Sequence, residues 1–153
     1  MDPTSTAPAP RTARPRWQVA AIGSLSFVAL LWVLEIVDES TGSFLDAQFF
    51  DVGVRPRSLD GLEGIAFAPL LHASYTHLMG NTVPLAVLGF ALLLISGVAR
   101  AIAVTAVVWL VAGIGVWLVA PADQIHLGAS VLVFGWLTYL LLRGIFVRSL
   151  AQV

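Results

Sequence analysis

Two short stretches of this 153-residue sequence gather side chains that could do chemistry. The first holds His72, His77 and Asn81, and the second is Gly128-Ala129-Ser130. His77 and Asn81 are one helical turn apart, so they would lie on one helix face. Imidazole, amide and hydroxyl groups at one level of a protein can form a reactive polar site, or they can hydrogen-bond neighbouring helices. We favour a site because both stretches open long apolar runs, which would bring their polar groups to a similar depth.

The elements that must position these groups are four long apolar runs. Hydrophobic residues make up 58% of the chain and charged residues 11%, with a mean hydropathy of +0.90. An ordinary soluble domain has about a quarter charged residues, so the composition excludes a soluble globular domain and a disordered chain. A helix needs about 20 apolar residues to cross a bilayer. The runs cover about residues 17–37, 70–95, 101–120 and 127–147.

These runs predict an all-α fold, a polytopic membrane helix bundle with four transmembrane helices. Residues 1–16 are rich in Pro, Ala, Thr and Arg and carry almost no bulky apolar side chain, which predicts a disordered tail. Residues 17–153 are expected to form one membrane domain. The first loop, about residues 38–64, is long and mixes Phe and Leu with acids, so we expect it to lie at the membrane surface and pack on the bundle.

The charges predict an orientation and exclude several partners. The net charge is −1 and no stretch is densely basic, which excludes a nucleic-acid binder. There is no cysteine, and we expect neither a cofactor nor a metal. If the runs alternate across the bilayer, most arginines fall on one side and most acids on the other. The bias of arginine toward the cytoplasm then predicts that both termini are cytoplasmic. The arginines on that side are Arg11, Arg14, Arg16, Arg100, Arg143 and Arg148.

With these motifs, the sequence resembles the rhomboid family of intramembrane serine proteases, of a bacterial, high-GC type, over about residues 65–144. The spaced histidines and asparagine are similar to the pattern on the family's second helix. Gly128-Ala129-Ser130 is similar to the family's nucleophile motif. Phe134 stands where the family carries an aromatic residue that packs beside the catalytic pair.

The resemblance implies peptide hydrolysis within the membrane. Ser130 would be the nucleophile, and the Ser130 N–H with the side chains of His77 and Asn81 would hold the oxyanion. His72 would help to line a water-accessible cavity. The implied partners are the lipid bilayer and the transmembrane segments of substrate or client proteins. The implied location is the bacterial cell membrane, as a multi-pass protein.

The sequence departs from the family pattern at two points. The family's general base is a histidine on a sixth span, whereas no histidine follows Ser130 here and Val153 ends the sequence after four runs. His126, four residues before Ser130 and expected on the same helix face, is a weaker candidate for the base. Val131 stands where the family usually has a small residue, which would let the base-bearing helix approach closely.

Several explanations of these departures stay open. The chain is interpreted as a C-terminally truncated protease, as half of a protein completed by another chain or by self-association, or as a pseudoprotease that binds transmembrane partners without cutting them. A small transporter or channel subunit is a further alternative of another class. Apart from Glu35, however, the runs carry no acid or arginine well inside them, which an ion-dependent role would need.

Overall fold

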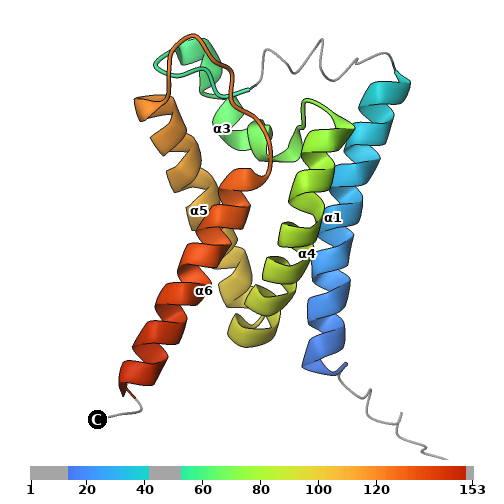
Figure 1. The fold of residues 1–153 in the computed structure, drawn as a ribbon, viewed down its shortest axis with the longest axis vertical. Helices are drawn as coiled ribbons and strands as arrows, with labels where there is room; N and C mark the ends of the chain where they lie inside the picture. The colour runs from blue at the N-terminus through green and yellow to red at the C-terminus, as the bar shows by residue number, and fades with distance from the viewer. Residues whose placement is uncertain (1–13, 42–52, 151–153) are drawn as a thin grey trace, which may run out of the picture.

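The computed structural model describes residues 14–41 and 53–150, with side chains as far as residue 147 (Figure 1). Most of the tail predicted to be disordered, residues 1–13, and part of the first loop, residues 42–52, lie outside the described residues. All regular elements in the described ranges are helical. They are α1 Arg16–Ser40, η2 Leu59–Gly61, α3 Gly64–Phe67, η3 Ala68–Leu70, α4 Tyr75–Ser96, α5 Val98–Val119 and α6 Ser130–Leu150.

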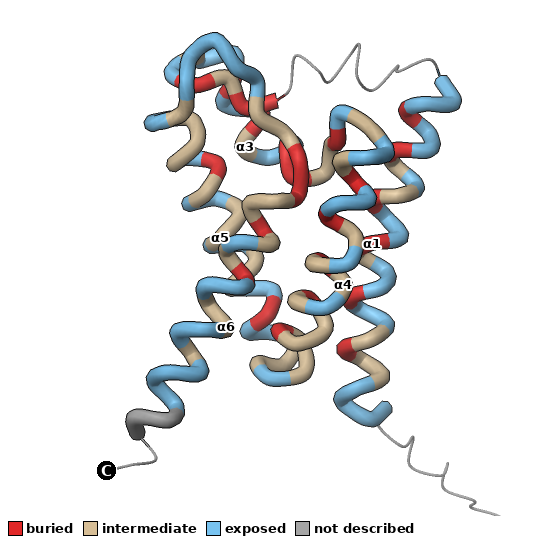
Figure 2. The backbone as a smooth tube through the Cα atoms, viewed as in Figure 1, coloured by how far each residue is buried: buried red, intermediate tan, exposed pale blue. Residues whose placement is uncertain are grey.

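Four of these helices, α1, α4, α5 and α6, are long and apolar enough to cross a membrane. They stand side by side as an open bundle, with the short helices between α1 and α4 gathered at one end (Figure 1). This confirms the predicted all-α bundle with four candidate spans. Exposed residues run along the outer faces of the long helices (Figure 2), as expected where lipid is the solvent.

Two helices begin later than the apolar runs predicted. Helix α4 begins at Tyr75 because Ser74 is extended and its Oγ accepts the N–H of His77 at 3.2 Å, which caps the helix. Helix α6 begins at Ser130 because Gly128 has a φ of +114°, which interrupts helical geometry. The expected positions are therefore corrected: His72 precedes its helix, and Ser130 is the first residue of α6 instead of lying one turn inside it.

Helices α1 and α4 pack along each other for most of their length. Ser24 Oγ donates to the carbonyl of Ala86 at 2.6 Å, and Trp32 Nε1 donates to Thr82 Oγ1 at 3.0 Å. Such bonds link helices where the bilayer offers no other partner. The packing of α4 against α1 and α6 fixes the orientation of the face of α4 that carries the first motif. The fully buried leucines of the core are Leu31, Leu78, Leu85, Leu92 and Leu132.

The described part of the first loop packs on α5 and on the segment before α6. Arg57 has a φ of +59°, and its N–H donates to the carbonyl of Trp117 at 2.9 Å. The Arg57 guanidinium donates to the carbonyls of Leu118 at 3.1 Å and Ala120 at 2.9 Å, which are last-turn acceptors of α5. The loop thus fastens the end of α5 and supports the chain that leads into α6, as expected for a loop packed on the bundle.

Candidate functional site at the junction of α4 and α6

Gly128 lies directly against the imidazole of His77. A Cβ added to Gly128 would come within 2.7 Å of Cε1 and 2.8 Å of Nε2 of His77, closer than real side chains approach. The φ of +114° is also one that L side chains rarely adopt. The Gly128 N–H donates to the carbonyl of Ala68 at 2.8 Å. Two independent reasons therefore favour glycine at position 128: the lack of space for a Cβ and the positive φ. The contact of Gly128 with His77 brings the two sequence motifs together.

His72 holds the next residue of the same turn. Its Nε2 accepts the backbone N–H of Ala129 at 3.3 Å, and its side chain is 3% exposed. The His72 and His77 rings meet edge to face, with centroids 5.3 Å apart and an angle of 75°. Since Nε2 accepts a hydrogen bond, the neutral ring carries its proton on Nδ1. That Nδ1 has no hydrogen-bond partner among the described residues.

The environment of His72 favours its neutral form. Burial, together with the neighbouring imidazole of His77, lowers the pKa of His72 from 6.5 to about 4. A protonated ring has two donors and no acceptor, so it could not bond the N–H of Ala129. The imidazole therefore holds the turn before α6 as a neutral acceptor at physiological pH.

Asn81 and Ser130 bring further polar groups to this junction. Asn81 lies one turn after His77 on α4, is 7% exposed, and its Nδ2 has no hydrogen-bond partner within the described ranges. Ser130 is half-buried and lines a cavity of about 150 Å³ between α6, η3, α3 and α5. No hydrogen bond between the Ser130 hydroxyl and His77 or Asn81 is found in the part of the chain that the structure describes.

His126 does not lie on α6, which corrects the expectation that it shares a helix face with Ser130. It forms an antiparallel bridge with Val54, with N–H to carbonyl distances of 2.9 and 3.0 Å. Its side chain lines the same small cavity as Ser130, and its Nε2 is buried without a partner among the residues described. His126 therefore approaches Ser130 from a loop instead of from the preceding helical turn.

Two other residues singled out in the sequence lie near the start of α6. Phe134 is 68% exposed, so its ring lies at the surface of the described bundle, and its role beside a catalytic pair stays a prediction. Val131 is half-buried and lines the small cavity. Within residues 14–41 and 53–147, no group of three or more His, Cys, Asp or Glu side chains could hold a metal ion.

This arrangement combines a hydroxyl with hydrogen-bond donors that lack partners. The first turn of a helix leaves its N–H groups without intrahelical acceptors and carries partial positive charge. Ser130 begins such a turn, and Asn81 adds a buried amide donor on the neighbouring helix. Donors arranged before the reaction are what stabilises negative charge on an oxygen atom in acyl transfer.

A family comparison covers both motifs. The model of the Rhomboid domain matches residues 61–153, which is more than half of the chain. The chain belongs to the rhomboid family. The resemblance drawn from the motifs is thereby confirmed, and the family together with the four apolar helices makes this a multi-pass membrane protein of a bacterium.

Curated relatives of this rhomboid-family chain are mycobacterial. An uncharacterized protein of Mycobacterium tuberculosis is 48% identical over 145 residues, and one of Mycobacterium leprae is 45% identical over 142 residues. The first match covers 90% of this chain and 58% of the relative, and the second covers 88% and 54%. The chain thus spans somewhat more than half the length of these relatives.

A more distant relative carries an activity in its name. A putative rhomboid protease of Bacillus subtilis is 38% identical over 66 residues, which cover 43% of this chain and 33% of that protein. No solved structure gives a significant match to the chain.

Sequence reasoning missed two features that position the candidate site. The first is the hydrogen bond that His72 accepts from the backbone N–H of Ala129. A backbone donor is the same in every residue type except proline, so the sequence does not indicate this bond. The bridge between Val54 and His126 joins distant segments through backbone groups alone. The sequence signal for Gly128 was present, because a glycine just before an apolar run often marks a special backbone conformation.

Proposed function

We propose that this chain carries the nucleophile and oxyanion-binding half of an intramembrane serine endopeptidase that cleaves transmembrane segments. The observation that carries the proposal is the contact of His77 with the backbone of Gly128, which brings the α4 motif to the start of α6. Membership of the rhomboid family and the name of the Bacillus subtilis relative support the same reaction class.

In the proposed reaction, the Ser130 hydroxyl attacks the scissile carbonyl of a substrate helix that has locally unwound. The negative charge that develops on the carbonyl oxygen is held by the Ser130 N–H, at the positive end of α6, and by His77 and Asn81. Removing one such donor in other enzymes lowers kcat by about 100- to 1000-fold. The partnerless Nδ2 of Asn81 supports its assignment, because a structural asparagine would bond a neighbouring helix.

We further propose that both termini are cytoplasmic, so that the site opens toward the opposite side of the membrane. Arg16 and Arg100 lie at helix ends away from the site, and Arg143 lies in the half of α6 that is farther from the site, in keeping with the bias of arginine toward the cytoplasm. Water needed for hydrolysis would then enter from the outer surface, where the first loop and the segment before α6 meet.

The general base is not assigned to any of the three histidines of this chain. His77 is assigned to the oxyanion, His72 accepts from Ala129, and His126 has no hydrogen bond to Ser130 in the described structure. A base from a further segment of a longer protein or from a second chain fits the proposal. Without it, the Ser130 hydroxyl is a weak nucleophile.

The second candidate function is a binding module that holds transmembrane partners without cutting them. The observation that favours it is the absence of a hydrogen-bonded base beside Ser130 in the described part of the chain. Both candidates use the same family fold and predict binding of a transmembrane segment. They differ in whether the peptide bond is cleaved.

The experiment reconstitutes the chain in liposomes with a transmembrane model substrate, alone and with the part of the Mycobacterium tuberculosis relative that lies outside the matched stretch. We expect cleavage in the complemented sample and its loss in Ser130→Ala, with labelling of Ser130 by a fluorophosphonate following the same pattern. Equal cleavage by Ser130→Ala would contradict the proposed nucleophile. Binding of the substrate without cleavage in every sample would favour the binding module.

A further inference from the structure

The end of the bundle away from the candidate site gathers positive charge. Arg16 opens α1, and its Nη2 lies 3.9 Å from the position of a Cβ on Gly97, in the turn between α4 and α5. Arg100 follows that turn by three residues and is exposed. All the acids described lie toward the other end of the bundle: Glu35, Asp38, Glu39, Asp60, Glu63 and Asp123.

Helix α6 is tied to the same turn. Arg143 Nη1 donates to the hydroxyl of Tyr139 at 3.5 Å, and that hydroxyl lies 3.3 Å from Ser96 Oγ, the last residue of α4. The guanidinium of Arg143 is therefore directed toward the α4–α5 turn. Arg16 and Arg100, in the first turns of α1 and α5, and Arg143, in the second half of α6, thus lie toward the same end of the bundle. No acid in the described part of the chain forms an ion pair with them.

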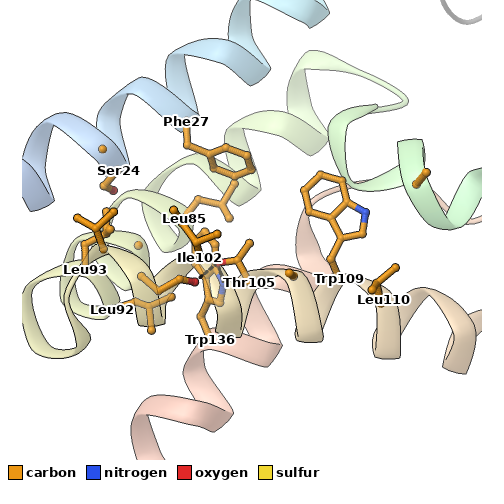
Figure 3. Close-up of a pocket in the computed structure, with 16 residues that line it drawn as sticks. Ser24, Phe27, Leu85, Leu92, Leu93, Ile102, Thr105, Trp109, Leu110 and Trp136 are labelled. Carbon is orange, nitrogen blue, oxygen red and sulfur yellow. Dashed lines mark hydrogen bonds between the residues drawn. The ribbon is translucent and has the colours of Figure 1, made fainter.

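A large apolar groove leads away from this turn into the bundle. It has a volume of about 720 Å³ and lies between α1, α4, α5 and α6 (Figure 3). Leu93 and Val98, on either side of Gly97, line the end of the groove nearest the arginines. The polar groups that line it are engaged within the protein, through the bonds Ser24 to Ala86, Trp136 to Thr105, Thr105 to Ala101 and Trp109 to Ile65.

We propose that the groove binds an acyl chain of an anionic phospholipid whose phosphate is held by Arg16 and Arg100. An apolar groove whose polar groups are already paired suits a hydrocarbon chain, and unneutralised guanidinium groups at its end suit a phosphate. Basic residues at the cytoplasmic ends of membrane helices attract anionic lipid in this way. This binding does not depend on proteolysis by the chain.

The test reconstitutes the full chain in nanodiscs of phosphatidylcholine alone or of an equal mixture with phosphatidylglycerol, and then counts retained lipid by native mass spectrometry. We expect phosphatidylglycerol to be retained in preference to phosphatidylcholine. Arg16→Gln and Arg100→Gln should each weaken that retention about fivefold. The matched control is Arg14→Gln, which removes the same charge at the same end from an exposed residue before α1.

A second arm tests the groove itself. Ala106 is exposed and lines the groove, so Ala106→Phe should fill it without entering the core and should lower retention while leaving the thermal unfolding midpoint unchanged. Soluble glycerol phosphate should not displace the lipid. Equal losses in Arg14→Gln and Arg100→Gln, unchanged retention in a folded Ala106→Phe, or displacement by glycerol phosphate would each overturn the proposal.

Discussion

At the residue scale, His72 is a buried imidazole that acts as a hydrogen-bond acceptor for the backbone before Ser130. The bond to Ala129 requires the neutral ring. Burial favours that neutral form, because it lowers the pKa of His72 to about 4. A side chain expected only to line a cavity therefore also holds the turn that presents the proposed nucleophile. This coupling makes the stability of the site depend on pH.

In the unfolded chain, His72 has a pKa near 6.5 and is protonated below that pH. In the folded chain, His72 stays neutral down to about pH 4. The free energy of unfolding should therefore be fully retained above pH 6.5 and should fall by about 3 kcal/mol as the pH drops to 4. His72→Gln keeps an acceptor that does not titrate, so it should lose less stability over this range. Unfolding in mixed micelles across this pH range measures the difference between the two proteins. Parallel curves for wild type and His72→Gln would contradict the assignment.

Asn81 differs from His72 because its buried Nδ2 donor has no hydrogen-bond partner in the described structure. Replacing a buried donor that lacks a bond by an apolar side chain of similar size removes a desolvation cost. Asn81→Leu should therefore leave the free energy of unfolding unchanged or raise it by about 1 kcal/mol, while cleavage by the complemented chain falls at least about 100-fold. A loss of stability of several kcal/mol in unfolding assays would show that Asn81 has a structural partner instead.

At the scale of elements, the four spans could be predicted from hydropathy alone, because every run of sufficient length became a helix. The helix starts could not, because Leu70, Leu71 and Leu127 are as apolar as helical residues yet lie outside the long helices. The cap at Ser74 and the positive φ of Gly128 set those boundaries. The sequence predicted that the two motifs converge. It did not predict the backbone hydrogen bonds of Gly128 and Ala129 that stabilise this arrangement, because backbone groups are common to nearly all residue types.

The loop between α1 and α4 depends on Arg57 for its attachment to α5. Arg57→Ala removes the bonds to the carbonyls of Leu118 and Ala120 and keeps the unfavourable φ of +59°. We expect a loss of about 1–2 kcal/mol in the free energy of unfolding. Arg57→Gly loses the same bonds but relieves the backbone strain, so it should be less destabilised than Arg57→Ala. If both variants unfold like the wild type in micelles, the loop is not fastened through this guanidinium.

At the scale of the whole molecule, the two ends of the bundle differ in the polar and charged groups that they carry, and the length of the helices separates them. One end holds the polar turn against α4, and Arg16, Arg100 and Arg143 lie toward the other end, near the apolar groove. The sequence could predict this division of charge, because arginine and acid positions follow directly from the order of the runs. It could not predict the groove, which depends on how far α1 and α5 stand from each other.

The contact between His77 and Gly128 matters at all three scales. It joins two residues, it packs α4 against the segment before α6, and it places the groups of the proposed reaction together. A double-mutant cycle of His77→Ala and Gly128→Ala, with unfolding free energies measured in mixed micelles, tests it most directly. Gly128→Ala alone should destabilise the chain, through a clash with His77 and an unfavourable φ. In the His77→Ala background the clash is gone, so the same change should cost less by about 1 kcal/mol or more. Strictly additive effects would contradict the contact and the junction of α4 with α6 that it supports.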